Sequence, residues 1–233
     1  MPAQRTVGQQ DFEAVRCLGV SLADQLDAYS MLHQEHQKAV AGLYDELVCR
    51  LKSGGAGLAA TTLGERIGSF ILPDSQGRLV TADDLLRCGP LVVSFNRGSW
   101  CPYCRLELLA LAKIHPEVKK LGGEIVSIIP ERGRSTGDLR DIYDLPFPVL
   151  SDIDNAYALA NGLMISIGAE LRQVLLEHGV DMARLHGNEG MLVPITATYV
   201  IASDGMVNHA FVDPDFRKRM PTEQVIAALQ VLQ

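Results

Sequence analysis

The chain has 233 residues, of which 47% are hydrophobic and 21% are charged, and it carries a formal net charge of -7. This composition excludes wholesale disorder, and the negative charge argues against nucleic acid as a partner. No apolar run is long enough for a membrane helix, so we expect a globular protein without a membrane partner.

The first predicted element is one long helix. Ser21 and Asp24 resemble a capping box, and Ser53-Gly54-Gly55 ends the helical pattern. An apolar stripe follows one face at intervals of three, four or eight residues. The stripe consists of Leu22, Leu26, Tyr29, Leu32, Val40, Leu43, Leu47 and Leu51. Such a helix of roughly 30 residues spans about 45 Å, so its stripe needs a partner. The partner is either the main domain or a second subunit, and we expect a homodimer.

The region after this helix divides the chain. Residues 52–62 are rich in Gly, Ala, Ser and Thr, which is typical of a linker. We therefore expect an N-terminal helical extension with its linker at residues 1–62 and a main domain at residues 63–233. Short strands alternate with helices in the main domain, which indicates an α/β fold.

The elements predicted in the main domain follow in chain order. Strands are expected at residues 70–72, 91–95 and 124–129, and helices at residues 81–87, 102–121, 152–162, 169–177 and 222–232. Ser203-Asp204-Gly205 predicts a hairpin between strands at residues 197–201 and 207–212. Residues 179–193 contain three glycines without a clear period, so a loop is expected there.

Trp100-Cys101-Pro102-Tyr103-Cys104 joins the predicted strand at residues 91–95 to a predicted helix. Cys101 would open that helix, where unpaired N–H groups and the helix dipole favour the thiolate. Lowering its pKa from about 8.5 to about 6 would raise the thiolate fraction at neutral pH from about 3% to about 90%. Pro102 suits the first turn because it lacks an N–H group. Cys104 follows one turn later on the same face, where it can act as the resolving thiol.

Other residues near the motif have two interpretations each. Arg97 either stabilises the thiolate or a peroxide oxygen, or it is a solvated loop arginine. Trp100 either shields the thiol and offers a flat surface to a partner protein, or simply packs. Arg217 and Arg219 belong to the densest basic run of the chain; they either approach the site from the C-terminal loop or face solvent, and we expect them to face solvent.

Cysteine usage indicates compartment and metal content. Five cysteines are an odd and low number for this length, which favours reduced thiols over a disulfide framework. Acidic residues surround the short apolar stretch at residues 18–23, so no secretory signal is expected and the location should be cytoplasmic. The remaining cysteines occur singly, and His33 and His36 lack further ligands, so we expect neither a metal site nor a cofactor.

Several stretches together resemble the thioredoxin fold and, more specifically, the peroxiredoxin-like branch of the alkyl hydroperoxide reductase and thiol-specific antioxidant (AhpC/TSA) family. They cover most of the main domain and comprise residues 70–74 with Gly77, 89–95, 97–104, 147–152, 197–201, 204–205 and 212–215. The resemblance implies a central mixed sheet flanked by helices. It also implies a hydroperoxide substrate and a thioredoxin-type or other thiol reductant.

Two positions depart from the family's pattern. Gly98 stands three residues before Cys101, where orthodox peroxiredoxins have Thr or Ser. Thr196, with Pro194 two residues earlier, stands where peroxiredoxins have an Arg and thioredoxins a cis-proline.

The leading hypothesis is a peroxiredoxin-like thiol oxidoreductase that reduces hydroperoxides, with Cys101 attacking and Cys104 resolving. The first alternative is a thioredoxin-like reductase of protein disulfides, which would use the same two thiols. The second is a non-catalytic redox-sensing or interaction module that assembles through the N-terminal helix.

Overall fold

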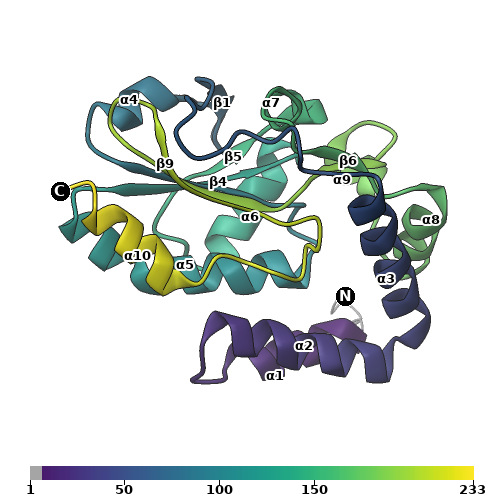
Figure 1. Ribbon diagram of the computed structural model, residues 1–233. Coiled ribbons are helices and arrows are strands. Elements are labelled where there is room, and N and C mark those ends of the chain that lie inside the picture. The colour runs from purple at the N-terminus through teal and green to yellow at the C-terminus, as the bar shows by residue number, and fades with distance from the viewer. Residues whose placement is uncertain (1–6) are drawn as a thin grey trace.

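The computed structural model describes residues 7–233 and is built around a five-stranded mixed sheet (Figure 1). The strand order is β5-β4-β3-β8-β9. The strands are β3 (Leu91–Phe95), β4 (Glu124–Ile129), β5 (Val149–Ser151), β8 (Ala197–Ile201) and β9 (Val207–Val212). Strand β3 is parallel to β4 and antiparallel to β8, and β8 pairs antiparallel with β9. The predicted mixed sheet and its late hairpin are thus confirmed.

The central strands are apolar on both faces because alternate side chains enter two different cores. In β3, Leu91, Val93 and Phe95 enter one core, whereas Val92 enters the other. The second core lies against α5 (Pro102–Lys120), α6 (Gly133–Ile142) and α10 (Thr222–Gln230). The first core is covered by α4 (Ala82–Leu86) and α7 (Ala156–Ala160) on the opposite face (Figure 1). The sheet is therefore flanked by helices on both sides.

The remaining elements are short and surround the sheet. They are β1 (Ile71–Pro73), β2 (Leu79–Thr81), the 3-10 helix Ile153–Asn155, β6 (Met164–Ser166), α8 (Ala169–Glu177), α9 (Met182–His186) and β7 (Leu192–Pro194). The loop predicted at residues 179–193 is wrong, because it contains α9 and β7. Strand β7 pairs with β6, which lies far before it in the sequence, and a short local window does not reveal such pairing.

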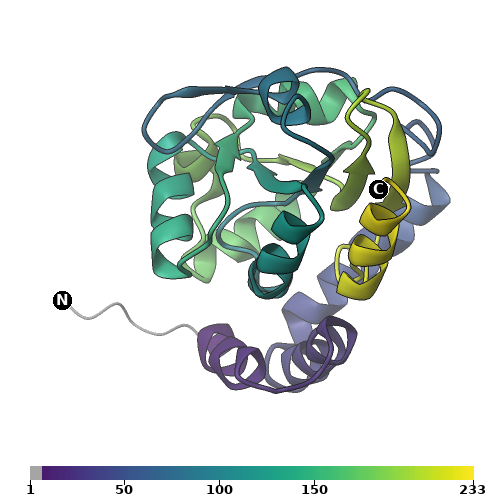
Figure 2. The same ribbon diagram turned by 90° about the vertical axis from the view of Figure 1, so that its left-hand side faces the viewer.

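The predicted single N-terminal helix is also wrong. The chain instead forms α1 (Val7–Arg16), α2 (Leu22–His36) and α3 (Lys38–Ser53). Gln37 separates α2 from α3 with φ -134° and ψ 50°, outside the helical region. The break lets α2 follow α5 while α3 turns to α8, which one straight helix cannot do. Figures 1 and 2 show α1 and α2 as a layer beneath α5.

The main domain, rather than a second subunit, covers the apolar stripe. Leu26, Tyr29 and Leu47 are buried in one cluster that also contains Tyr103 of α5 and Leu171 of α8. An uncovered stripe was the reason to expect a homodimer, so that expectation loses its basis and stays an untested prediction. The domain boundary at residue 62 likewise stays a prediction, and residues 1–6 of the expected extension lie outside the described residues. Within residues 7–233, no helix has both the length and the apolarity needed to cross a membrane.

Candidate active site

Cys101 caps the N-terminus of α5 at the end of the loop that leaves β3. Its backbone is extended, with φ -86° and ψ 113°, and Pro102 is the first residue of the helix, as predicted. Cys101 is 1% exposed and Cys104 is fully buried, and both are free thiols. The sequence therefore places both sulfurs at the helix start, and the fold encloses them.

The two thiols share a side-chain hydrogen bond, and their pKa values move in opposite directions. Burial raises the pKa of Cys101, but the hydrogen bond from Cys104 and the charges of Arg97 and Arg219 outweigh it and lower this pKa to about 5. Burial, the hydrogen bond to Cys101 and the negative charge on Cys101 raise the pKa of Cys104 well above its ordinary value. The first proton therefore leaves from Cys101, while Cys104 stays protonated as the donor.

Arg97 lies inside an aromatic cage beside Cys101. The centre of its guanidinium is 3.8 Å from the ring centroid of Phe216, 4.8 Å from that of Trp100 and 5.9 Å from that of Tyr44. Arg97 is 1% exposed, and none of its three side-chain nitrogens has a hydrogen-bond partner among the described residues. Arg97 is therefore not a solvated loop arginine. Its buried charge stabilises an anion on the Cys101 sulfur.

The loop before Cys101 has no room for the family's usual hydroxyl residue at position 98. Gly98 has φ +138°, which side chains disfavour. A Cβ atom there would lie 2.4 Å from Oε1 of Glu131 and 2.6 Å from Nε1 of Trp100. Glu131 is fixed because it accepts hydrogen bonds from the backbone N–H (2.7 Å) and the hydroxyl (2.8 Å) of Ser99. The departure at Gly98 is thus required by the shape of this loop.

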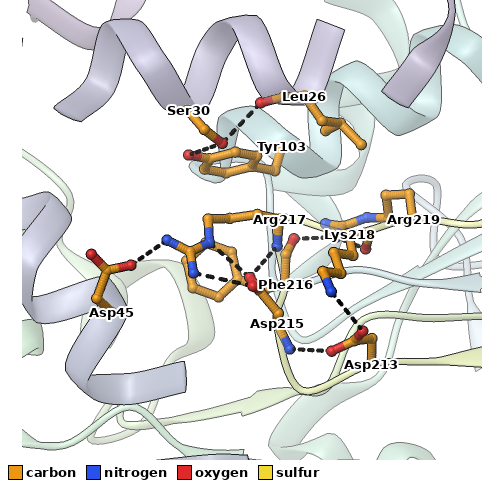
Figure 3. Close-up of polar contacts among 10 residues, drawn as sticks. All are labelled: Leu26, Ser30, Asp45, Tyr103, Asp213, Asp215, Phe216, Arg217, Lys218 and Arg219. Carbon is orange, nitrogen blue, oxygen red and sulfur yellow. Dashed lines mark hydrogen bonds and ion pairs between the residues drawn. The ribbon is translucent and has the colours of Figure 1, made fainter. Parts of the chain in front are cut away.

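The C-terminal loop brings Arg219 to the thiol pair. Nη2 of Arg219 lies 3.2 Å from Sγ of Cys104, and its side chain is 1% exposed, so the expected solvent-facing position is wrong. Arg217 is also partly enclosed: it donates to Asp215 (2.7 Å) and to Asp45 of α3 (2.5 Å), which ties the loop to the N-terminal layer (Figure 3). The charge pattern of the sequence contained no sign of these distant partners.

The two histidines considered for metal binding have separate partners. The ring of His33 is buried and stacks on Tyr44, with centroids 5.2 Å apart. His36 instead hydrogen-bonds to the carboxylate of Asp11. The described residues contain no group of three or more His, Cys, Asp or Glu side chains placed to hold a metal ion.

A cavity of about 1120 Å³ opens beside the motif. Trp100 and Pro102, the two neighbours of Cys101, line it together with Arg105 of α5. The opposite walls come from α2, α3 and α8 and include Tyr29, His33, Val40, Tyr44, Val174 and Leu175. The N-terminal helices therefore form one wall of a large space next to the buried thiols.

A family model described as the AhpC/TSA family matches residues 63–210. The chain belongs to the AhpC/TSA family. This match begins before β1, ends within β9 and includes the helix that begins after Cys101. It confirms the peroxiredoxin-like resemblance and, with the relatives below, the expectation of a thiol-dependent enzyme.

The relatives of this AhpC/TSA protein are peroxiredoxins. It is 27% identical over 170 residues to peroxiredoxin Q of Oryza sativa subsp. japonica, covering 73% of this chain and 66% of that protein. It is 25% identical over 103 residues to the putative peroxiredoxin bcp of Coxiella burnetii, covering 44% of this chain and 68% of that protein. Among solved structures, peroxidoxin BcpB from Mycobacterium tuberculosis shares the fold with a TM-score of 0.58 at 21% identity, covering 74% of this chain and 99% of that one.

Proposed function

We propose that this protein is a thiol peroxidase in which Cys101 attacks a hydroperoxide and Cys104 resolves the product. The observation that carries the proposal is the placement of the two thiols: Cys101 caps α5 beside the buried guanidinium of Arg97, and Cys104 hydrogen-bonds to it from one turn later. This placement lowers the pKa of Cys101 and raises that of Cys104. Arg97 supplies a fixed positive charge next to the attacking sulfur. Trp100 covers that charge, and Pro102 begins the helix whose N-terminus faces the thiolate.

The reaction runs in two steps on these sulfurs. The Cys101 thiolate attacks the terminal peroxide oxygen, so an S–O bond forms, the O–O bond breaks, and the alkoxide or hydroxide that leaves takes up a proton. Sulfur loses two electrons and the peroxide gains them. Cys104 then attacks the sulfur of the Cys101 sulfenic acid, forming the S–S bond, and the departing hydroxide combines with the Cys104 proton to give water.

A third step must regenerate the enzyme. Two electrons from an external thiol reductant, either a small thiol or a thioredoxin-type protein, would reduce the Cys101–Cys104 disulfide by thiol–disulfide exchange. Such a reductant works in a reducing compartment. We therefore also propose that the protein acts in the cytoplasm.

Burial of the attacking sulfur favours the peroxidase over the reductase of protein disulfides. Cys101 is 1% exposed, and a protein disulfide would have to reach bonding distance of it through Trp100 and Pro102. A hydroperoxide is far smaller, so it would need much less displacement to reach Cys101 from the adjacent cavity, which Trp100 and Pro102 line. The lowered pKa of Cys101 also disfavours a non-catalytic module. A buried thiolate needs compensating groups around it, whereas a neutral cysteine that only packs in the core does not.

Replacing Cys104 with Ser tests the proposal by trapping the intermediate. The variant should add one oxygen atom at Cys101 on treatment with a hydroperoxide, as seen by intact mass, whereas a Cys101→Ser variant should add none. Wild type should consume peroxide with a thioredoxin-type reductant much faster than it reduces insulin. A stable mixed disulfide between the Cys104→Ser protein and insulin, with no oxygen adduct, would instead favour the reductase. If neither the oxygen adduct nor the mixed disulfide forms, the result would favour the interaction module.

A further inference from the structure

A buried polar cluster lies between α5 and the sheet, directly beside the resolving thiol. Glu107 and Arg219 form an ion pair whose side chains are only 3% and 1% exposed. Thr198 of β8 and Ser94 of β3 also bond to Glu107 from the sheet. Burying two charges costs desolvation that a well-packed apolar pair would avoid, so fold stability alone does not account for this cluster.

The cluster fixes Arg219 so that one end of its guanidinium points at sulfur. Nε donates to Oε2 of Glu107 at 2.6 Å, and Nη1 donates to the carbonyl oxygens of Phe216 and Lys218. The other carboxylate oxygen of Glu107 is held by the hydroxyl of Thr198 at 2.9 Å. Nη2 is left to face Sγ of Cys104 at 3.2 Å. Because a guanidinium is planar, fixing two of its nitrogens also fixes the direction of the third.

We propose that Arg219 is a catalytic residue of the resolving step, which stabilises Cys104 as a thiolate after Cys101 has been oxidised, and that Glu107 is its positioning residue. The inference rests on the proposed peroxidase function, and it assigns the resolving thiol the cation that touches its sulfur. Arg97 and Arg219 both lower the pKa of Cys101, and Arg219 in addition lies against the sulfur of Cys104.

The order of the two ionisations follows from the charges that face Cys104. In the reduced protein, burial, the hydrogen bond to Cys101 and the negative charge on Cys101 keep Cys104 protonated. Conversion of Cys101 to a neutral sulfenic acid removes that charge. Glu107 then still disfavours the thiolate, Arg219 still favours it, and Tyr44 of α3 stays neutral because burial raises its pKa. Oxidation of Cys101 is therefore the event that lets Arg219 ionise its neighbour.

The resolving step balances with these groups alone. The Cys104 sulfur gives up its proton and attacks the Cys101 sulfur, the S–S bond forms and the S–O bond breaks. The hydroxide that leaves accepts the released proton and becomes water. Arg219 gains and loses nothing, since it only stabilises the negative charge that develops on Cys104.

The test compares Arg219→Met with wild type in a rapid-quench experiment that follows both steps by mass after adding one equivalent of hydrogen peroxide. At pH 7.5 we expect formation of the Cys101 sulfenic acid to change much less than disulfide formation, because Arg97 and the hydrogen bond from Cys104 still lower the pKa of Cys101 in the variant. We expect disulfide formation to slow by about tenfold or more, equivalent to a rise of at least one unit in the pKa of Cys104. The pH midpoint of disulfide formation should rise correspondingly.

The matched control is Lys218→Met, which removes the neighbouring positive charge from an exposed side chain whose ion-pair partner is Asp213 at 3.8 Å (Figure 3). It should leave both steps unchanged. Excess peroxide gives a second reading: sulfinic acid at Cys101 should accumulate in Arg219→Met but not in Lys218→Met, since a sulfenic acid that resolves slowly is oxidised further.

Arg219→Lys covers the case in which the Met variant does not fold. Lysine keeps the positive charge but lacks the planar guanidinium that contacts both Glu107 and Cys104. We therefore expect disulfide formation in this variant to be about threefold to tenfold slower than in wild type. An unchanged rate of disulfide formation in the folded Arg219 variants, or an equal slowing in Lys218→Met, would overturn the inference. If wild type forms no sulfenic acid at all, the proposed function fails instead, so the two failures are distinguishable.

Discussion

Replacing Gly98 with Ala should destabilise the protein more than a backbone argument alone predicts. The φ of +138° costs a residue with a side chain about 1–3 kcal/mol. In addition, the new Cβ would lie 2.4 Å from Oε1 of Glu131, so that carboxylate must move. Its movement weakens the hydrogen bonds from Ser99, each worth about 1.5–3 kcal/mol because the acceptor is charged.

Gly64→Ala is the matched control, because Gly64 has φ +80° but no atom within 4 Å of the point where a Cβ would lie. The difference between the two variants contains the contact with Glu131 and the larger backbone cost of φ +138°, and we expect it to be about 2–4 kcal/mol in urea unfolding. For a chain of this size, that difference corresponds to about 4–16 °C in Tm. Equal destabilisation of both variants would refute the reasoning about Glu131. Gly98→Thr should likewise destabilise the loop rather than restore the hydroxyl of orthodox peroxiredoxins.

Three further results are expected. Arg97→Met should raise the pKa of Cys101, so the rate of thiol alkylation should fall far more at pH 6 than at pH 8.5; an equal loss at both pH values would contradict the electrostatic role. The pKa of Cys101 is about 5 in the folded protein and has an ordinary value of 9.0, so at any pH between these two values unfolding takes up a proton. The stability of wild type relative to Cys101→Ser should therefore rise from pH 5 to pH 8 in thermal unfolding, and a flat difference would exclude this linkage. Glu107→Gln should cost about 3–5 kcal/mol by leaving Arg219 buried without its counter-ion. The exposed ion pair of Asp84 with Arg87 provides the comparison, because Asp84→Asn should cost only about 0–1 kcal/mol.

Local patterns predicted much of the domain. The buried strand before Cys101, the helix after it and the late hairpin each depend on residues within one short window, and each is present. The N-terminal helix failed for the opposite reason. Its apolar stripe continued through Gln37 in the sequence, but the surfaces of α5 and α8 that cover the two halves require a change of direction there.

Local sequence was enough to place the two thiols, because a strand, a turn and a helix start are local structures and Pro102 marks the first turn. The charges that surround the thiols depend instead on the whole fold. Arg219 reaches Glu107 across 112 positions of sequence, and Phe216 covers Arg97 from the same distant loop. Pairing of this kind depends on how β9 and the following loop return over α5, which no short-range pattern of charge or hydrophobicity encodes.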